Sequence, residues 1–90
     1  MDTQKDVLIQ DLSLISGKSV VVGAKQLRKA LNAGKANYVF LARNADPALT
    51  GPFAEKCQED NIKYAWVKSM DDLGRACGIE IGAAAAAIIG

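Results

Sequence analysis

Short apolar segments alternate with segments of helical periodicity along this 90-residue chain, and that alternation limits the possible folds more than any other feature. Runs rich in β-branched and aromatic residues predict buried strands at Ser19–Val22, Tyr38–Ala42 and Tyr64–Val67. Helical spacing with flanking Gly and Pro predicts four helices, at about Thr3–Ile15, Ala24–Asn32, Thr50–Asn61 and Met70–Cys77. Strands that alternate with helices over short loops predict an α/β/α sandwich around a small sheet.

Three further local signals concern the ends of these elements. Asp46-Pro47 predicts a turn, and Ser69 is expected to cap the helix that follows it, with Asp72 at the third helical position. The last segment, Ala83 to Ile89, leaves two alternatives open. Its five consecutive alanines favour a helix, whereas about seven residues are short for a helix and fit a strand.

The composition argues against catalysis. The chain contains no histidine, which removes the commonest general base and the commonest metal ligand, and no carboxylates are spaced to share a proton. We therefore expect no enzymatic activity, no metal and no cofactor. Cys57 and Cys77 are expected to be free thiols, because the polar N-terminus carries no export signal. The apolar end is shorter than the ~20 residues of a membrane span, so we expect no membrane partner. We also expect the protein to be cytoplasmic and a monomer.

Charge is distributed unevenly, although the net charge is only +1. Between Leu12 and Ala45 there are six basic residues and no acidic ones, whereas the remainder holds five basic and ten acidic residues. Such segregation indicates an electrostatic binding surface, the alternative being chance clustering on an exposed helix.

Most of this charge falls on the predicted helix Ala24–Asn32. At about 100° per residue, one stripe of the helix collects Lys25, Arg28, Lys29 and Asn32. The opposite side is apolar and is expected to face the sheet; it holds Ala24, Leu27, Ala30 and Leu31.

The start of this helix is suited to nucleic acid. Gly23 allows close approach, and the helix dipole adds partial positive charge there. Lys25 and Gln26 carry groups that can bind a base edge, while Arg28 and Lys29 suit phosphates.

A second unusual feature is the loop between Gly78 and Gly82, in which Ile79 and Ile81 flank Glu80. Branched apolar side chains in an exposed loop can pack on an unstacked base. The alternative, that both isoleucines turn into the core, has equal support from the residues alone.

Three runs of residues resemble one known family. They are Val-Gly-Ala-Lys-Gln at 22–26, Leu-Ala at 41–42 leading to Ala-Asp-Pro at 45–47, and Leu-Gly-Arg-Ala-Cys-Gly-Ile-Glu-Ile-Gly-Ala-Ala-Ala at 73–85. The chain resembles the kink-turn-binding ribosomal proteins related to the archaeal L-seven-Ae and L-thirty-e proteins, in their small bacterial branch. The resemblance covers about Ser19 to Ile89. Ninety residues fit one domain, expected over residues 1–90, and the helix expected within residues 1–18 lies outside the matching region.

The resemblance implies a three-layer α/β/α sandwich with a four-stranded mixed sheet, in which the alanine-rich end is the fourth strand. It also implies a function: binding kink-turns, sharply bent RNA duplexes built around tandem sheared G·A pairs. The glycine-led helix would enter the major groove at the G·A pairs, and the later loop would cover bulge bases. These roles would fall on Gly23, Lys25, Gln26 and Lys29, and on Ile79, Glu80 and Ile81. The bound RNA is left open as rRNA, a riboswitch or another structured RNA, and no DNA is expected.

Two departures from the family pattern bear on this expectation. Archaeal members carry Asn-Glu in place of Lys25-Gln26, a difference usual in the bacterial branch that implies altered selectivity. Asn44 stands where an acidic residue is usual, with Arg43 before it, so the role of that position is open. A second hypothesis is a protein-interaction module on the same fold, whose basic helix meets an acidic partner.

Overall fold

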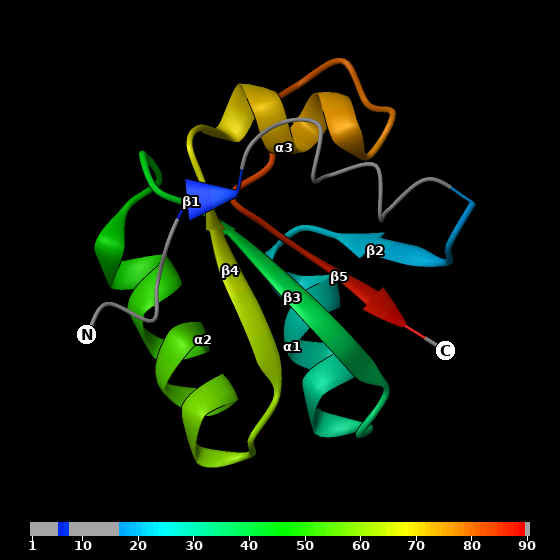
Figure 1. Ribbon diagram of the computed structural model, residues 1–90, viewed down its shortest axis with the longest axis vertical. Helices are drawn as coiled ribbons and strands as arrows, with labels where there is room; N and C mark the ends of the chain where they lie inside the picture. The colour runs from blue at the N-terminus through cyan, green and yellow to red at the C-terminus, as the bar shows by residue number, and fades with distance from the viewer. Residues whose placement is uncertain (1–5, 8–16, 90) are drawn as a thin grey trace.

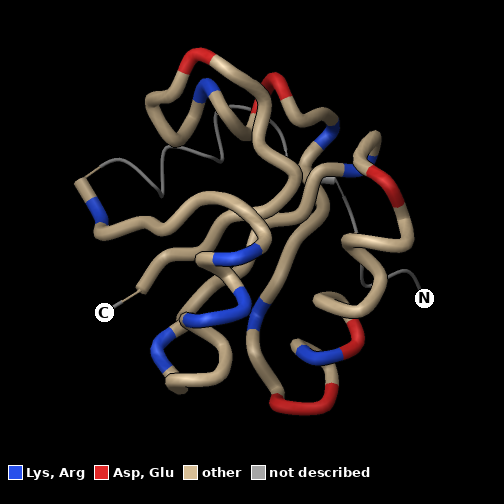
Figure 2. The backbone as a smooth tube through the Cα atoms, turned by 180° about the vertical axis from the view of Figure 1, so that it is seen from behind, with Lys and Arg blue, Asp and Glu red and all other residues tan. Residues whose placement is uncertain are grey.

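The computed structural model describes residues 6–7 and 17–89 (Figure 1; Figure 2 shows the reverse side). Its elements, in chain order, are β1 (Asp6–Val7), β2 (Val20–Val22), α1 (Ala24–Asn32), β3 (Ala36–Ala42), α2 (Pro47–Glu59), β4 (Lys63–Val67), α3 (Met70–Ala76) and β5 (Ala85–Ile89). From β2 to β5 the strands and helices alternate, as the sequence predicts.

In the described part of the chain, five strands form one mixed sheet in the order β1-β4-β3-β5-β2, and within it β4-β3-β5-β2 are the four strands that the resemblance implies. β3 and β4 are parallel, and β5 runs antiparallel to both β2 and β3. The alanine-rich end is thus a strand. Its pairing on both sides supplies backbone hydrogen bonds that outweigh the helix propensity of alanine.

The short strand β1 corrects the sequence-based prediction at the N-terminus. Asp6 and Val7 pair in parallel with Trp66 and Val67 of β4, so the helix expected over Thr3–Ile15 is wrong at these two residues. β4 offers unpaired backbone groups along its outer side, and pairing with β1 satisfies them. The rest of that expected helix lies outside the described residues.

The sheet separates two helical layers. The buried cluster on one face takes side chains from α1 and α2, and the cluster on the other takes Leu73 from α3. β5 contributes to both, because Ala85 and Ala87 face α1 while Ala86 faces α3. This arrangement confirms the three-layer α/β/α sandwich.

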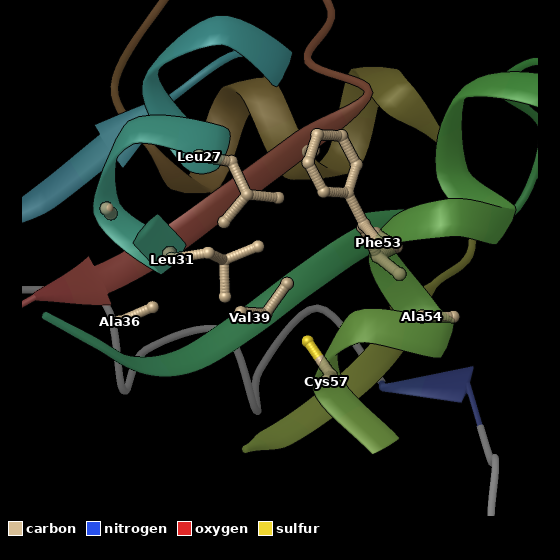
Figure 3. Close-up of a cluster of buried hydrophobic side chains, with 11 residues drawn as sticks. Leu27, Leu31, Ala36, Val39, Phe53, Ala54 and Cys57 are labelled. Carbon is tan, nitrogen blue, oxygen red and sulfur yellow. The ribbon is translucent and has the colours of Figure 1, made fainter. Parts of the chain in front are cut away.

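The larger core lies where α1 and α2 meet over β3. Figure 3 shows Leu27 and Leu31 of α1 directed toward Phe53 and Cys57 of α2, above Val39. Leu27, Val39 and Cys57 are fully buried. Burial of each large apolar side chain stabilises the fold by about 1.5–3 kcal/mol, which fixes the basic helix on the sheet.

Two helix starts test the local predictions. Ser69 caps α3 as expected, because its Oγ accepts a hydrogen bond of 3.1 Å from the backbone N–H of Asp72. Asp46-Pro47, predicted to be a turn, instead begins α2. Asp46 Oδ1 accepts a hydrogen bond of 2.9 Å from the N–H of Ala48, and Pro47 occupies the first helical position, which needs no donor.

Candidate nucleic-acid interface

One edge of the sheet gathers the segments that the sequence analysis singled out. β2, β3 and β4 all end at this edge, and β5 begins there because it runs in the opposite direction. The start of α1, Arg43 and Asn44 after β3, Lys68 and Ser69 after β4, and the loop before β5 therefore meet at one end of the fold.

The start of α1 presents unblocked backbone donors. Gly23, the residue before the helix, has φ 100° and ψ 155°, a conformation that is essentially restricted to glycine. It has no side chain to cap the first turn, so within the described residues no N-cap side chain occupies the N–H groups at the helix start, which suits them to a ligand. The partial positive charge of the helix dipole makes them suited to an anion.

The exposed side chains of α1 follow the predicted stripe. Lys25, Gln26, Arg28 and Lys29 are exposed, whereas Leu27, Ala30 and Leu31 are buried. Figure 2 shows Lys and Arg, and neither Asp nor Glu, along this helix. The sequence analysis therefore identified the buried and exposed sides of α1 correctly.

Arg28 differs from the two lysines in its surroundings. Its guanidinium carbon lies 5.7 Å from the centroid of the Phe53 ring, within cation–π range. Together with Phe53, Leu49 and Lys56 it lines a hollow of about 240 Å³ between α1 and α2. The charge of Arg28 is thus held at the α2 side of the basic helix.

The two isoleucines of the loop between Gly78 and Gly82 lie in different environments. Ile79 is half-buried and packs against the core beneath α3, whereas the side chain of Ile81 is 75% exposed. Glu80 between them is also exposed. Ile79 therefore turns toward the core, as one alternative expects. Ile81 follows the other alternative, because its apolar side chain is exposed to a ligand.

Asn44 and Gly74 were not among the predicted site residues, yet both contact this region. Asn44 Oδ1 accepts a hydrogen bond of 2.8 Å from the backbone N–H of Met70, at the start of α3. A Cβ on Gly74 would collide with the carbonyl oxygen of Ile81. A glycine inside a helix pattern is a general signal of such close approach, but the asparagine contact spans two loops and has no local signal.

Arg43, the neighbour of Asn44, is directed toward β4. Its guanidinium carbon lies 5.7 Å from the centroid of the Trp66 ring, and its backbone N–H donates a 2.7 Å hydrogen bond to the carbonyl of Val67. These contacts fix the end of β3 against the end of β4.

The described residues contain neither a group of metal ligands nor a membrane-spanning helix. Within residues 6–7 and 17–89, no three Cys, Asp or Glu side chains are grouped to hold a metal ion. No helix in the same ranges is long and apolar enough to cross a membrane. Both cysteines are free thiols, and burial raises the pKa of Cys57 to about 11, with the nearby charge of Asp60 adding to the effect.

A comparison with protein families finds one match. The model described as the ribosomal protein L7Ae/L30e/S12e/Gadd45 family matches residues 9–90, nearly the whole chain.

Individual proteins agree with this match. A protein of Bacillus pumilus named RNA-binding protein is 44% identical over 72 residues, which cover 80% of this chain and 88% of the relative. The large ribosomal subunit protein eL8 of Halobacterium salinarum is 36% identical, over 79% of this chain and 60% of that protein. Among solved structures, the Giardia lamblia 15.5kD RNA binding protein has a TM-score of 0.74 and 29% identity, over 91% of this chain and 67% of that one.

Proposed function

We propose that this chain, which belongs to the ribosomal protein L7Ae/L30e/S12e/Gadd45 family, is a non-catalytic RNA-binding protein that recognises kink-turns. One observation carries the proposal: the unblocked, basic N-terminus of α1 and the exposed Ile81 share one edge of the sheet. A helix start supplies donors to phosphates and base edges, and an exposed branched side chain can cover an unstacked base.

In this proposal each exposed residue at the start of α1 has its own role. Gly23 allows α1 to approach the tandem G·A pairs, and Lys25 and Gln26 contact base edges in the groove. Arg28 and Lys29 contact phosphates on either side of the helix start. All four side chains are exposed, and the division between them follows their chemistry and their distance from the helix start.

The loop acts as the second contact. Ile81 covers a base of the bulge, while Ile79 holds the loop on the core, since the first is exposed and the second is half-buried. Glu80, also exposed, is placed to accept a hydrogen bond from a base amino group.

The proposal also includes the localisation, oligomeric state and cofactors expected from the sequence. The protein acts as a cytoplasmic monomer, without a metal or other cofactor, on structured RNA such as rRNA or a riboswitch. The RNA-binding names of its relatives support the class of ligand.

A titration with two RNA duplexes tests the proposal. One carries a kink-turn, and the other has the G·A pairs replaced by Watson–Crick pairs. Because the second duplex keeps the phosphates but loses the bend and the exposed base edges, we expect the kink-turn to bind at least about tenfold more tightly. A DNA duplex of the same sequence is the control for the class of nucleic acid.

Equal affinity for the two RNA duplexes would contradict kink-turn recognition. If, in addition, an acidic protein partner stayed bound after nuclease treatment, the second hypothesis of a protein-interaction module would gain support. The apolar hollow beside Arg28 is the observation that favours that alternative.

A further inference from the structure

The loop that carries Ile79 to Ile81 is attached to α3 by two backbone hydrogen bonds. The N–H of Ile79 donates to the carbonyl of Gly74 (3.0 Å), and the N–H of Ala83 donates to the carbonyl of Met70 (3.0 Å). The loop is thus held at both ends by one short helix, so its position follows that of α3.

Gly74 sets how closely the middle of the loop approaches this helix. Gly74 is buried, and a Cβ built on it would overlap the carbonyl oxygen of Ile81. The same Cβ would lie 3.2 Å from the Cα of Gly82, which is tighter than ordinary van der Waals contact. The exposed Ile81 therefore has its observed position only because residue 74 has no side chain.

Asn44 in turn fixes the start of α3. Its Oδ1 accepts a 2.8 Å hydrogen bond from the N–H of Met70, the residue whose carbonyl holds Ala83. Asn44 follows β3, whose end is bonded to β5 because the N–H of Ala42 donates to the carbonyl of Ala84 (2.9 Å). The Ala83 end of the loop is therefore tied to the sheet twice, directly through the bond between Ala42 and Ala84 and indirectly through Asn44 and the start of α3.

We propose that Asn44, Met70 and Gly74 form a clamp that fixes the Ile79–Ile81 loop at a set distance from the N-terminus of α1, before any RNA is bound. Asn44 and Gly74 act here as positioning residues, and this inference rests on the proposed function. The family resemblance leads one to expect an acid at position 44. In this clamp the side-chain oxygen of Asn44 has a role of its own, because it accepts a hydrogen bond from the first N–H of α3.

Gly74→Ala is the first test, with Gly51→Ala as its matched control. Both glycines lie inside helices, but a Cβ at Gly51 meets no atom within 4 Å. We expect Gly74→Ala to weaken kink-turn binding about tenfold or more, because a displaced loop no longer meets the base that α1 aligns. Its affinity for the Watson–Crick duplex should stay unchanged, and Gly51→Ala should bind both duplexes like the wild type.

A second pair of variants covers the case in which Gly74→Ala does not fold. Asn44→Leu removes the acceptor at similar size, whereas Asn44→Asp keeps it and places a negative charge at the start of α3, where the dipole favours it. We expect amide hydrogen exchange of Met70 and Ala83 to become faster in Asn44→Leu and to stay near wild type in Asn44→Asp. Kink-turn affinity should follow the same order when measured at high salt, which screens the added charge.

Hydrogen exchange separates this inference from the proposed function, because it needs no RNA. If the wild type shows no preference for kink-turns, the proposed function fails, and the exchange data still decide whether the clamp exists. Wild-type exchange at Met70 and Ala83 in Asn44→Leu would overturn the clamp, whether or not Gly74→Ala folds. Faster exchange with unchanged kink-turn affinity would overturn its role in binding.

Discussion

The backbone N–H of Gly23 donates a 2.8 Å hydrogen bond to the carbonyl oxygen of Ala85. This bond joins the start of α1 to the start of β5, although the two residues lie far apart in the sequence. The segment before Ala85 is the loop that carries Ile81. The two parts of the candidate interface are therefore neighbours because the sheet pairs β2 with β5, and not because of any local sequence feature.

Gly23→Ala should affect both stability and RNA binding. Its φ of 100° with ψ of 155° is accessible to glycine alone, so an alanine there costs about 1–3 kcal/mol or forces the helix start to move. Urea unfolding should show the first effect, and titration of the folded variant with kink-turn RNA the second. Gly34→Ala is the control, because its φ of 70° at the other end of α1 strains an alanine without touching the interface. Wild-type RNA affinity in Gly23→Ala would remove Gly23 from the contact surface.

The salt dependence of binding should identify the phosphate contacts. Each lysine or arginine that contacts an RNA phosphate releases counterions, so Lys29→Ala and Arg28→Ala should each lower the slope of log K against log salt by about 0.7–0.9. Lys63, an exposed cation at the start of β4, is the matched control. Slopes measured between low and moderate salt should remain at the wild-type value for Lys63→Ala. If Lys29→Ala behaves like this control, Lys29 makes no phosphate contact.

Local patterns predicted most of the fold. α1 begins and ends where its apolar stripe predicts, because the glycines on either side and the buried leucines act over a few residues. β1 and β5 were harder to predict, since strand identity there depends on backbone pairing with distant segments. The alanines of β5 left helix and strand equally possible until the resemblance favoured a strand.

The same distinction holds for the candidate site. The exposed cations of α1 follow from periodicity, so the sequence alone indicated them. The opposite environments of Ile79 and Ile81 depend on how closely the loop approaches α3, and the Asn44 contact joins two loops. Gly74 signals a close approach to α3 but not which segment approaches, and the Asn44 contact leaves no spacing or composition signal in the chain.

Ile81→Ala and Ile79→Ala should separate binding from stability. Ile81 is 75% exposed, so its truncation should change the free energy of unfolding by less than about 0.5 kcal/mol. If it packs on a base, losing three carbon groups at about 0.8 kcal/mol each costs up to about 2.4 kcal/mol, a roughly 50-fold weaker complex with unchanged salt slope. Ile79→Ala should lower both stability and affinity, because that side chain packs against the core. An Ile81→Ala variant that binds like the wild type would exclude the isoleucine from the RNA contact.

Alkaline destabilisation should reveal the buried thiol of Cys57. Its pKa rises from 9.0 to about 11, first because the fully buried sulfur loses water and second because the charge of Asp60 disfavours a thiolate. The unfolded chain therefore loses this proton at lower pH than the folded protein. The contribution of the neutral thiol to stability is complete below pH 9 and falls as the pH rises toward 11, by about 3 kcal/mol for a shift of about two units.

Urea unfolding of the wild type and of Cys57→Ala checks this expectation. The measurements run from pH 8, about one unit below the ordinary thiol pKa of 9.0, to pH 11, which is about the pKa of the buried thiol. The two proteins differ only at residue 57, so pH effects common to both cancel in the difference. Cys57→Ala should be less stable near pH 8, because truncation leaves unfilled space under α2, and the gap should narrow as the pH rises. A difference independent of pH would show that the sulfur of Cys57 is more accessible to water than its complete burial against α1 and β3 indicates.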